Sequence, residues 1–130
     1  MFLPITLSSA AAAAVLAIWL GGRIGRIRVG EKVLHGDGGH PLLARRIRAQ
    51  LNYTEYTPFV LALIAAIELA GRGGQWLAWV AAAYFTARIA HAFGMDGETP
   101  SKFRAAGVMV TLLVLAGLAI FAALVAAGVV

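Results

Sequence analysis

Two long runs without a charged side chain lie at the two ends of the chain, and they constrain the fold more than any other feature. Residues 1–22 and 105–130 contain no Asp, Glu, Lys or Arg. Each run exceeds the roughly 18 apolar residues that suggest a membrane-spanning helix. The rest of the chain is also apolar, since 61% of its 130 residues are hydrophobic and 13% are charged. We therefore expect an all-α integral membrane protein.

Four spanning helices are predicted, at about residues 3–25, 42–70, 75–95 and 103–128, in a single domain that covers residues 1–130. The connections between them are rich in glycine and proline, as turns between helices usually are. No basic residue precedes the first apolar run, so the first helix is expected to be retained rather than cleaved as a signal peptide.

Basic residues are distributed unevenly over the connections. The first connection and its flanks carry Arg23, Arg26, Arg28, Lys32, Arg45, Arg46 and Arg48, and the third carries Lys102 and Arg104. The second connection carries only Arg72. The positive-inside rule then predicts that the first and third connections are cytoplasmic and that both termini are outside. The net charge of +5 is thereby explained by the membrane, and we expect no nucleic-acid partner.

The second predicted helix carries a polar stripe where an apolar surface is expected. Arg48, Asn52 and Glu55 are spaced as i, i+4 and i+7, which places them on one face of a helix, with Tyr56 at its edge. Ionisable groups inside spanning helices are costly and usually functional. This stripe is therefore a candidate binding site, while anchoring at the membrane surface and helix packing are the structural alternatives.

The third predicted helix carries a second stripe with the same spacing, Tyr84, Arg88 and His91. Counted from the tight turn between the two helices, Glu55 and Arg88 both lie about 20 Å along their helices. Equal depth predicts an ion pair between Glu55 and Arg88, because each charge would offset the burial of the other. Asn52 and His91 would match one turn further along.

Other chemistries receive little support. The chain has no cysteine, so it has neither a disulfide nor a thiolate of its own, and any thiol must come from a ligand. His35, Asp37 and His40 lie in the glycine-rich sequence HGDGGH, which predicts a turn rather than a metal site. Glu68 lies at the far end of the second helix and is interpreted as a cap or packing group.

The segment RAQLNYTEYTPFVLALIAAIELAG, with the pattern Arg-x-x-x-Asn-x-x-Glu-Tyr-x-Pro, closely resembles the second-helix signature of the MAPEG family, the membrane-associated proteins in eicosanoid and glutathione metabolism. The basic first connection with its GDGG turn and the Arg-x-x-His pattern that ends at His91 fit the same family. The resemblance covers essentially the whole chain and is to bacterial-type members. It implies a homotrimer of four-helix subunits, with glutathione bound between adjacent subunits near the cytoplasmic face.

The resemblance also implies how glutathione is held. Arg48 and one arginine from the end of the first helix, Arg23 or Arg26, would bind its carboxylates. Asn52 and Glu55 would contact its γ-glutamyl end, with Glu55 at the ammonium group. Guanidinium groups suit carboxylates because they donate two parallel hydrogen bonds.

The remaining site residues follow from the same resemblance. Tyr56, Arg88 and His91 would complete the wall of the site, and Arg104 would be the catalytic residue that stabilises the glutathione thiolate. A cation beside sulfur favours the nucleophilic thiolate, since a free thiol is mostly protonated at neutral pH. The family's frequent tyrosine one turn after this unit is absent, because residues 93–95 are Phe-Gly-Met.

The expected function is that of a membrane glutathione transferase with a role in detoxification. Glutathione would be its co-substrate, and no metal is expected. Glutathione-dependent peroxidase activity is a further possibility that the sequence leaves open. Its second substrate would be an apolar electrophile or lipid hydroperoxide that arrives through the bilayer. A bacterial inner membrane is the expected location. Two alternatives remain, a small four-helix transporter and a non-catalytic membrane component whose polar cluster only fixes a trimer. The known small exporters use a carboxylate in the first helix, which this chain lacks there.

Overall fold

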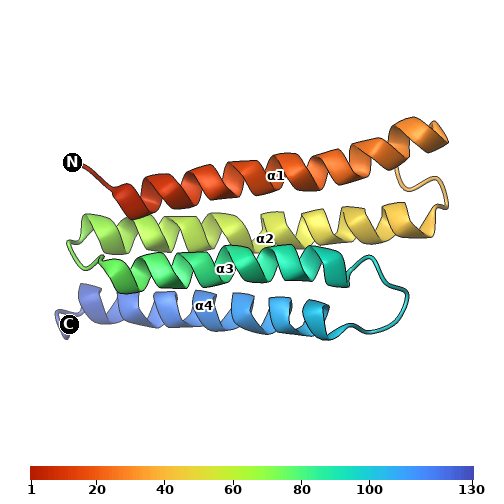
Figure 1. The fold of residues 1–130 in the computed structure, drawn as a ribbon. Coiled ribbons are helices and arrows are strands. Elements are labelled where there is room, and N and C mark those ends of the chain that lie inside the picture. Colours follow the sequence, from red (N-terminus) through yellow and green to blue (C-terminus); the bar gives the residue numbers. More distant parts are fainter.

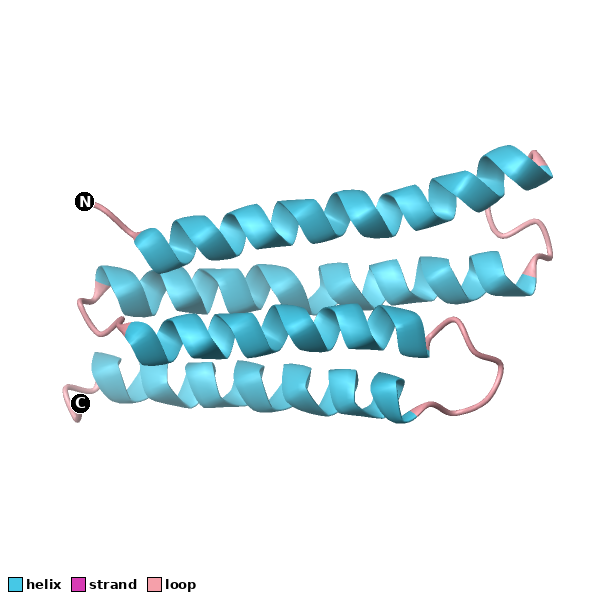
Figure 2. Cartoon of the chain, viewed as in Figure 1, coloured by secondary structure: helices cyan, strands magenta, loops and turns pink.

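The chain forms a bundle of four long helices. The computed structural model describes residues 1–130, and Figure 1 shows the helices packed side by side along their length. They are α1 (Pro4–Glu31), α2 (Pro41–Leu69), α3 (Gln75–Gly94) and α4 (Lys102–Ala126). All regular structure is helical (Figure 2). The predicted all-α, four-helix fold is confirmed.

The two ends of the bundle differ in what they carry. Both termini and the short turn between α2 and α3 lie at one end, which we call the termini end (Figure 1). The longer connections, residues 32–40 and 95–101, lie at the other end, which we call the connection end. Consecutive helices are antiparallel, so α2 and α4 both begin at the connection end. The first turns of α2 and α4 therefore share this end with the last turns of α1 and α3.

Helix α1 ends at Glu31, six residues beyond the predicted end at residue 25. The glycines near that point do not stop it, because a glycine inside a helix costs only about 1 kcal/mol relative to alanine. The helix stops at Lys32, which adopts a left-handed conformation with φ 54° and donates its backbone N–H to the carbonyl of Arg28. Arg28 also places a positive charge in the last turn, where it interacts favourably with the negative end of the helix dipole.

The HGDGGH segment forms a turn, as predicted. The Asp37 carboxylate accepts a hydrogen bond from the Gly39 N–H at 2.9 Å, and the Asp37 carbonyl accepts one from the His40 N–H at 2.8 Å. His40 then caps α2, since its Nδ1 accepts the Leu43 N–H at 3.3 Å. Asp37 and His40 are thus both used in building the connection between α1 and α2.

Glu68 caps a different helix from its own. Its carboxylate accepts hydrogen bonds from the backbone N–H of Ile5 at 3.0 Å and of Thr6 at 2.7 Å, and from the Thr6 hydroxyl at 2.7 Å. The first turn of α1 has no cap within its own sequence, and Pro4 has no N–H to satisfy. A carboxylate from α2 therefore satisfies the free donors of α1 and ties the two helices together at the termini end.

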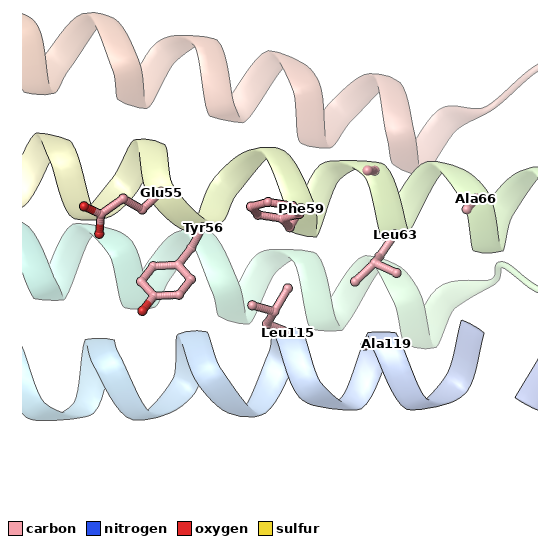
Figure 3. A pocket seen from close by; sticks show the side chains of 8 residues that line it. Glu55, Tyr56, Phe59, Leu63, Ala66, Leu115 and Ala119 are labelled. Atoms are coloured by element: carbon pink, nitrogen blue, oxygen red, sulfur yellow. The ribbon is translucent and has the colours of Figure 1, made fainter. Parts of the chain in front are cut away.

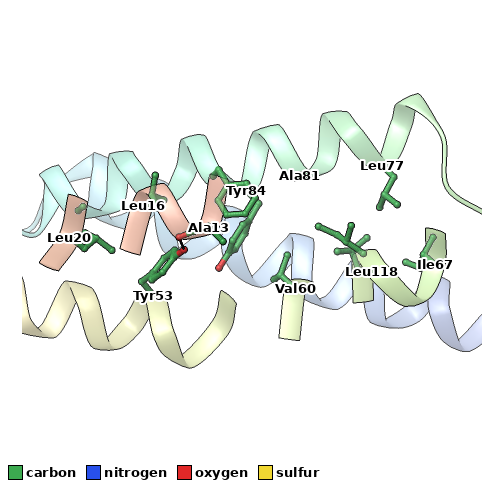
Figure 4. Close-up of a cluster of buried hydrophobic side chains, with 13 residues drawn as sticks. Ala13, Leu16, Leu20, Tyr53, Val60, Ile67, Leu77, Ala81, Tyr84 and Leu118 are labelled. Atoms are coloured by element: carbon green, nitrogen blue, oxygen red, sulfur yellow. Dashed lines mark hydrogen bonds between the residues drawn. The ribbon is translucent and has the colours of Figure 1, made fainter. Parts of the chain in front are cut away.

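The core lies along the middle of the bundle and consists mainly of aliphatic side chains with two tyrosines (Figure 4). The hydroxyl of Tyr53 donates to the backbone carbonyl of Ala13 at 2.6 Å and so links α2 to α1. The hydroxyls of Thr57 and Tyr84 share a hydrogen bond of 2.7 Å between α2 and α3. Both buried tyrosines thus satisfy their polar ends while their rings fill the core.

Helices α3 and α4 approach each other closely at two glycines. A Cβ on Gly107 would lie 2.5 Å from the His91 Cβ and 2.8 Å from the Ala87 carbonyl oxygen. A Cβ on Gly94 would lie 2.3 Å from the backbone nitrogen of Arg104. Small residues permit such contacts between helices in membranes. These two positions set how near α4 comes to the polar residues of α3.

By length and composition, α1 and α4 are apolar enough to cross a membrane. Their apolar side chains are largely exposed on the outside of the single chain, as Val15 and Ile18 on α1 and Leu113 and Ile120 on α4 show. Lipid or a second protein surface is the natural environment for such residues.

Candidate functional site

The polar stripe of α2 faces away from the core of the bundle. At 100° per residue, Glu55 lies about 150° around the helix from the centre of the buried stripe that includes Tyr53, Val60 and Ile64, and Asn52 lies about 90° from it. The side chains of Arg48 and Glu55 are accordingly 62% and 48% exposed, and their charged groups approach to 3.6 Å. The charged pair of Arg48 and Glu55 therefore lies on the outer surface of the chain.

An open groove of about 640 Å³ begins at Glu55 and runs toward the termini end between α2 and α4. Figure 3 shows Glu55 at one end of the labelled set and Tyr56, Phe59 and Leu63 following it along α2. Apart from Glu55, its lining is hydrophobic, comprising Tyr56, Phe59, Ala62, Leu63, Ala66, Leu115 and Ala119. The groove is thus apolar along its length and has a charged pair at one end.

The predicted ion pair between Glu55 and Arg88 is wrong. Arg88 donates instead to the Asn52 Oδ1 at 2.7 Å, while Glu55 pairs with Arg48 on its own helix. The reason is rotational, because the buried stripe of α2 faces α1 and α3 and Glu55 lies on the opposite side of the helix. Equal depth along two helices did not imply that the side chains face each other.

Arg88 lies at the centre of a buried polar cluster. Only 2% of it is exposed, and it donates to the Thr111 hydroxyl of α4 at 3.1 Å as well as to Asn52. The Nδ1 of His91 lies 3.4 Å from it. The Thr111 hydroxyl in turn donates a hydrogen bond to the Gly107 carbonyl at 2.8 Å. Arg88 thereby ties α2, α3 and α4 together without any carboxylate partner.

A second polar cluster, which the sequence did not predict, forms around Asp96 at the connection end. The Asp96 carboxylate forms ion pairs with Arg23 of α1 and Arg46 of α2, and its backbone carbonyl accepts from Arg45 at 3.2 Å. The Arg23 guanidinium also lies 4.9 Å from the centre of the Trp19 ring. Arg23, which was one of the two arginines expected to bind a glutathione carboxylate, is therefore buried and paired with Asp96.

Arg26 and Arg104 have no side-chain partner within the chain and are exposed. Arg104 lies in the first turn of α4, within about 20° of the stripe that carries Leu115 in the groove. Because Arg88 bonds to both Asn52 and Thr111, these two residues share a level in the bundle. Arg104 precedes Thr111 by seven residues and so lies about 10 Å nearer the connection end.

The structure thus divides the predicted site residues into two sets. Arg48 and Glu55 are exposed on the outer face of α2, Asn52 and Tyr56 lie half-buried beside them, and exposed Arg26 and Arg104 lie nearer the connection end. Buried within the bundle are Arg23, Arg88 and His91. No three side chains that commonly bind metals converge.

Each of the two polar clusters left a signal in the sequence. The small-x-x-x-small pattern formed by Gly107 and Thr111 marks a close helix contact on α4. Asp96 is an acidic residue two positions after the end of α3, at the end of the bundle that also carries most of the arginines.

A four-helix bundle, with two helices apolar enough to cross a membrane and an apolar groove on its surface, is the architecture of a helical integral membrane protein. Comparison with family models gives the particular family. Residues 6–124 match the model of the MAPEG family, and the chain therefore belongs to that family. No curated protein matches the sequence.

Proposed function

We propose that this protein is a membrane-bound glutathione transferase, which binds glutathione between the subunits of a homotrimer and activates its thiol toward apolar electrophiles. The MAPEG family includes glutathione transferases and related membrane proteins. The observation that carries the proposal is the junction at Glu55, where exposed charged groups of α2 meet the apolar groove between α2 and α4. Such a junction suits a reaction between a charged peptide and an apolar second substrate.

The charges of the exposed groups match those of glutathione. The tripeptide has two carboxylates and one ammonium group, so its site needs several cationic donors and one acceptor. Arg48 and Arg26 supply cations for the two carboxylates, Glu55 supplies the acceptor for the ammonium group, and Arg104 supplies a further cation for the thiol. Of the two candidate arginines on α1 we choose Arg26, since Arg23 is held by Asp96. Tyr56 lines the groove beside Glu55.

The distance between Asn52 and Arg104 also fits a tripeptide. The two residues are separated by about 10 Å along the bundle axis, and an extended chain of three residues spans about 10 Å. A glutathione molecule held at Asn52 and Glu55 would therefore bring its central cysteine within reach of the long Arg104 side chain. The guanidinium would favour the thiolate.

A second subunit is proposed to cover the stripe. Arg48 and Glu55 are about half exposed on a helix of a membrane bundle, and exposed charges at membrane depth are costly. The surface of a neighbouring subunit, which would bring its own α1 arginines, offsets that cost and closes the groove. The same arrangement places glutathione at the cytoplasmic face if the arginine-rich connection end is cytoplasmic.

The apolar part of the groove is proposed to hold the second substrate. Its lining from Phe59 to Ala119 contains only aromatic and aliphatic side chains, which accept apolar molecules of many shapes. An electrophile or a lipid hydroperoxide dissolved in the bilayer could enter from the side, and reduction of the latter would be the peroxidase reaction.

Purified protein in detergent should bind glutathione and conjugate it to an aromatic halide such as chlorodinitrobenzene. Arg104→Ala should lower kcat and leave glutathione affinity nearly unchanged, whereas Arg48→Ala should weaken glutathione binding by about tenfold, as expected for the loss of one charge-assisted hydrogen bond. Arg72→Ala, at the termini end, is the matched control. Wild-type protein that neither binds nor conjugates glutathione would overturn the proposal.

A further inference from the structure

Arg88 is a buried cation without a nearby anion. Its contacts are the Asn52 amide, the Thr111 hydroxyl and the His91 ring, and its Nε has no partner at all. With 2% of its surface exposed, it cannot itself reach a ligand in the groove. Its effect on a ligand must therefore pass through the residues that it holds.

The contact with Asn52 determines which way that amide points. A guanidinium group has only donors, so the amide must turn its oxygen toward Arg88. The hydrogen bond is 2.7 Å long, as expected when the donor is charged. The Asn52 Nδ2 consequently points away from Arg88, and the side chain of Asn52 takes part in the chain's hydrogen bonds only as an acceptor. A free amide donor is left beside the exposed stripe of α2.

We propose that Arg88 is a positioning residue, which holds Asn52 so that α2 presents an amide donor and the Glu55 carboxylate, one helical turn apart, to the α-amino acid end of the ligand. This inference rests on the proposed function. The Asn52 Nδ2 donates to the α-carboxylate of the γ-glutamyl group, and Glu55 accepts from the ammonium on the same carbon. The pair therefore selects a free α-amino acid head group rather than any anion.

The surroundings of Arg88 keep this arrangement rigid. Gly107 lets α4 approach α3 so closely that Thr111 reaches Arg88, and the Thr111 hydroxyl is itself fixed by the Gly107 carbonyl. An amide held in one orientation loses less freedom when it binds a ligand. Without Arg88, Asn52 could turn its oxygen toward the ligand carboxylate, which would repel it.

A double-mutant cycle tests the inference by calorimetric titration of glutathione into the detergent-solubilised protein. Arg88→Met and Asn52→Ala should each weaken binding about tenfold, the effect of one hydrogen bond to a charged group. Arg88→Met should add little in the Asn52→Ala background, because both changes remove the same donor. Additive losses would mean that Arg88 acts independently of Asn52 and would overturn the proposal.

A glutathione analogue gives the second readout. Converting the γ-glutamyl α-carboxylate to a carboxamide should weaken binding to the wild type and have a much smaller effect on Asn52→Ala and Arg88→Met. Equal losses in all three proteins would contradict the assigned contact. Tyr84→Phe is the matched control, since it removes a buried hydrogen bond of α3 that does not involve Asn52. It should bind glutathione like the wild type.

Asn52→Asp separates this role from a role in folding. An aspartate at this position can still accept from Arg88 and supplies its missing anion, so thermal stability should not fall. It has no donor for the ligand, so glutathione binding should fall more than tenfold, and unchanged binding would overturn the inference. If the wild type fails to bind glutathione, the proposed function falls with it. If the wild type binds and Arg88→Met binds equally well, only the inference falls.

Discussion

At the scale of single residues, arginines that look alike in the sequence differ in burial and in their partners. Arg23 and Arg88 are buried and link helices, whereas Arg26 and Arg104 are exposed without a side-chain partner, and exposed Arg48 pairs with Glu55 on its own helix. Whether an arginine contributes to structure or to binding depends on its partner. For Arg23 that partner is Asp96.

Removing the Asp96 charge should therefore destabilise the protein. Asp96→Asn leaves the buried Arg23 without its anion, and breaking a buried pair on one side costs about 3 kcal/mol. Unfolding in detergent, followed by circular dichroism at rising temperature, would measure the loss. Glu98→Gln, in the same connection but without an ion pair, is the control. Equal stability of the two variants would show that Asp96 does not hold the helix ends together.

At the scale of helices, close approach decides which polar groups meet. Gly107 and Gly94 let α4 lie against α3, and only this proximity allows Thr111 to accept from Arg88. Similarly, Glu68 from α2 completes the first turn of α1. In both cases the local sequence predicts that each segment is helical, but it does not predict which helix lies beside it.

Gly107→Ala should push α3 and α4 apart. The added methyl group would collide with His91 and with the Ala87 carbonyl, and overpacking of this kind costs about 1 to 3 kcal/mol. Gly117→Ala, on the same helix but with nothing near the added group, should not destabilise the protein because alanine favours helix formation. Thermal unfolding of the two variants measures the difference, and the prediction fails if they are equally stable.

Glu68→Gln should loosen the start of α1. The neutral amide offers one acceptor instead of a charged pair of oxygens, so the amide groups of Ile5 and Thr6 lose part of their stabilisation. Hydrogen exchange of residues 4–8, followed by mass spectrometry, should become faster. Glu31→Gln, at the opposite end of α1 and exposed, should leave exchange of this segment unchanged. Slow exchange in both variants would exclude the capping role.

At the scale of the whole molecule, the single chain leaves the charged pair of Arg48 and Glu55 and an apolar groove beside it uncovered. We expect three chains to assemble so that each stripe is covered by a neighbour. Native mass spectrometry in detergent should give three times the chain mass of 13.6 kDa, and a monomer that still binds glutathione would contradict the proposed location of the site between subunits.

Glutathione should also stabilise that assembly. A ligand that binds only the folded state adds about 2.7 kcal/mol of stability at a concentration of one hundred times Kd. The rise in Tm should be lost in Glu55→Gln, which keeps the size of the side chain and removes its charge. Arg72→Ala, distant from the site, should retain it. A similar rise in Glu55→Gln would show that the ammonium contact at Glu55 is not required.

The sequence by itself determined the helices and the family. Uncharged runs at both ends, glycine-rich connections and the polar spacing of residues 48–56 indicated the four helices, the polar stripe and the MAPEG resemblance, because periodicity and hydropathy are local properties of the chain. Tertiary structure alone decided the partners. Arg88 meets Asn52 and not Glu55, and Asp96 gathers Arg23 with Arg46. Such pairings depend on how each helix is rotated about its axis and on how closely it packs against its neighbours. Sequence spacing determines the depth of a residue along its helix, but it determines neither the rotation nor the packing distance.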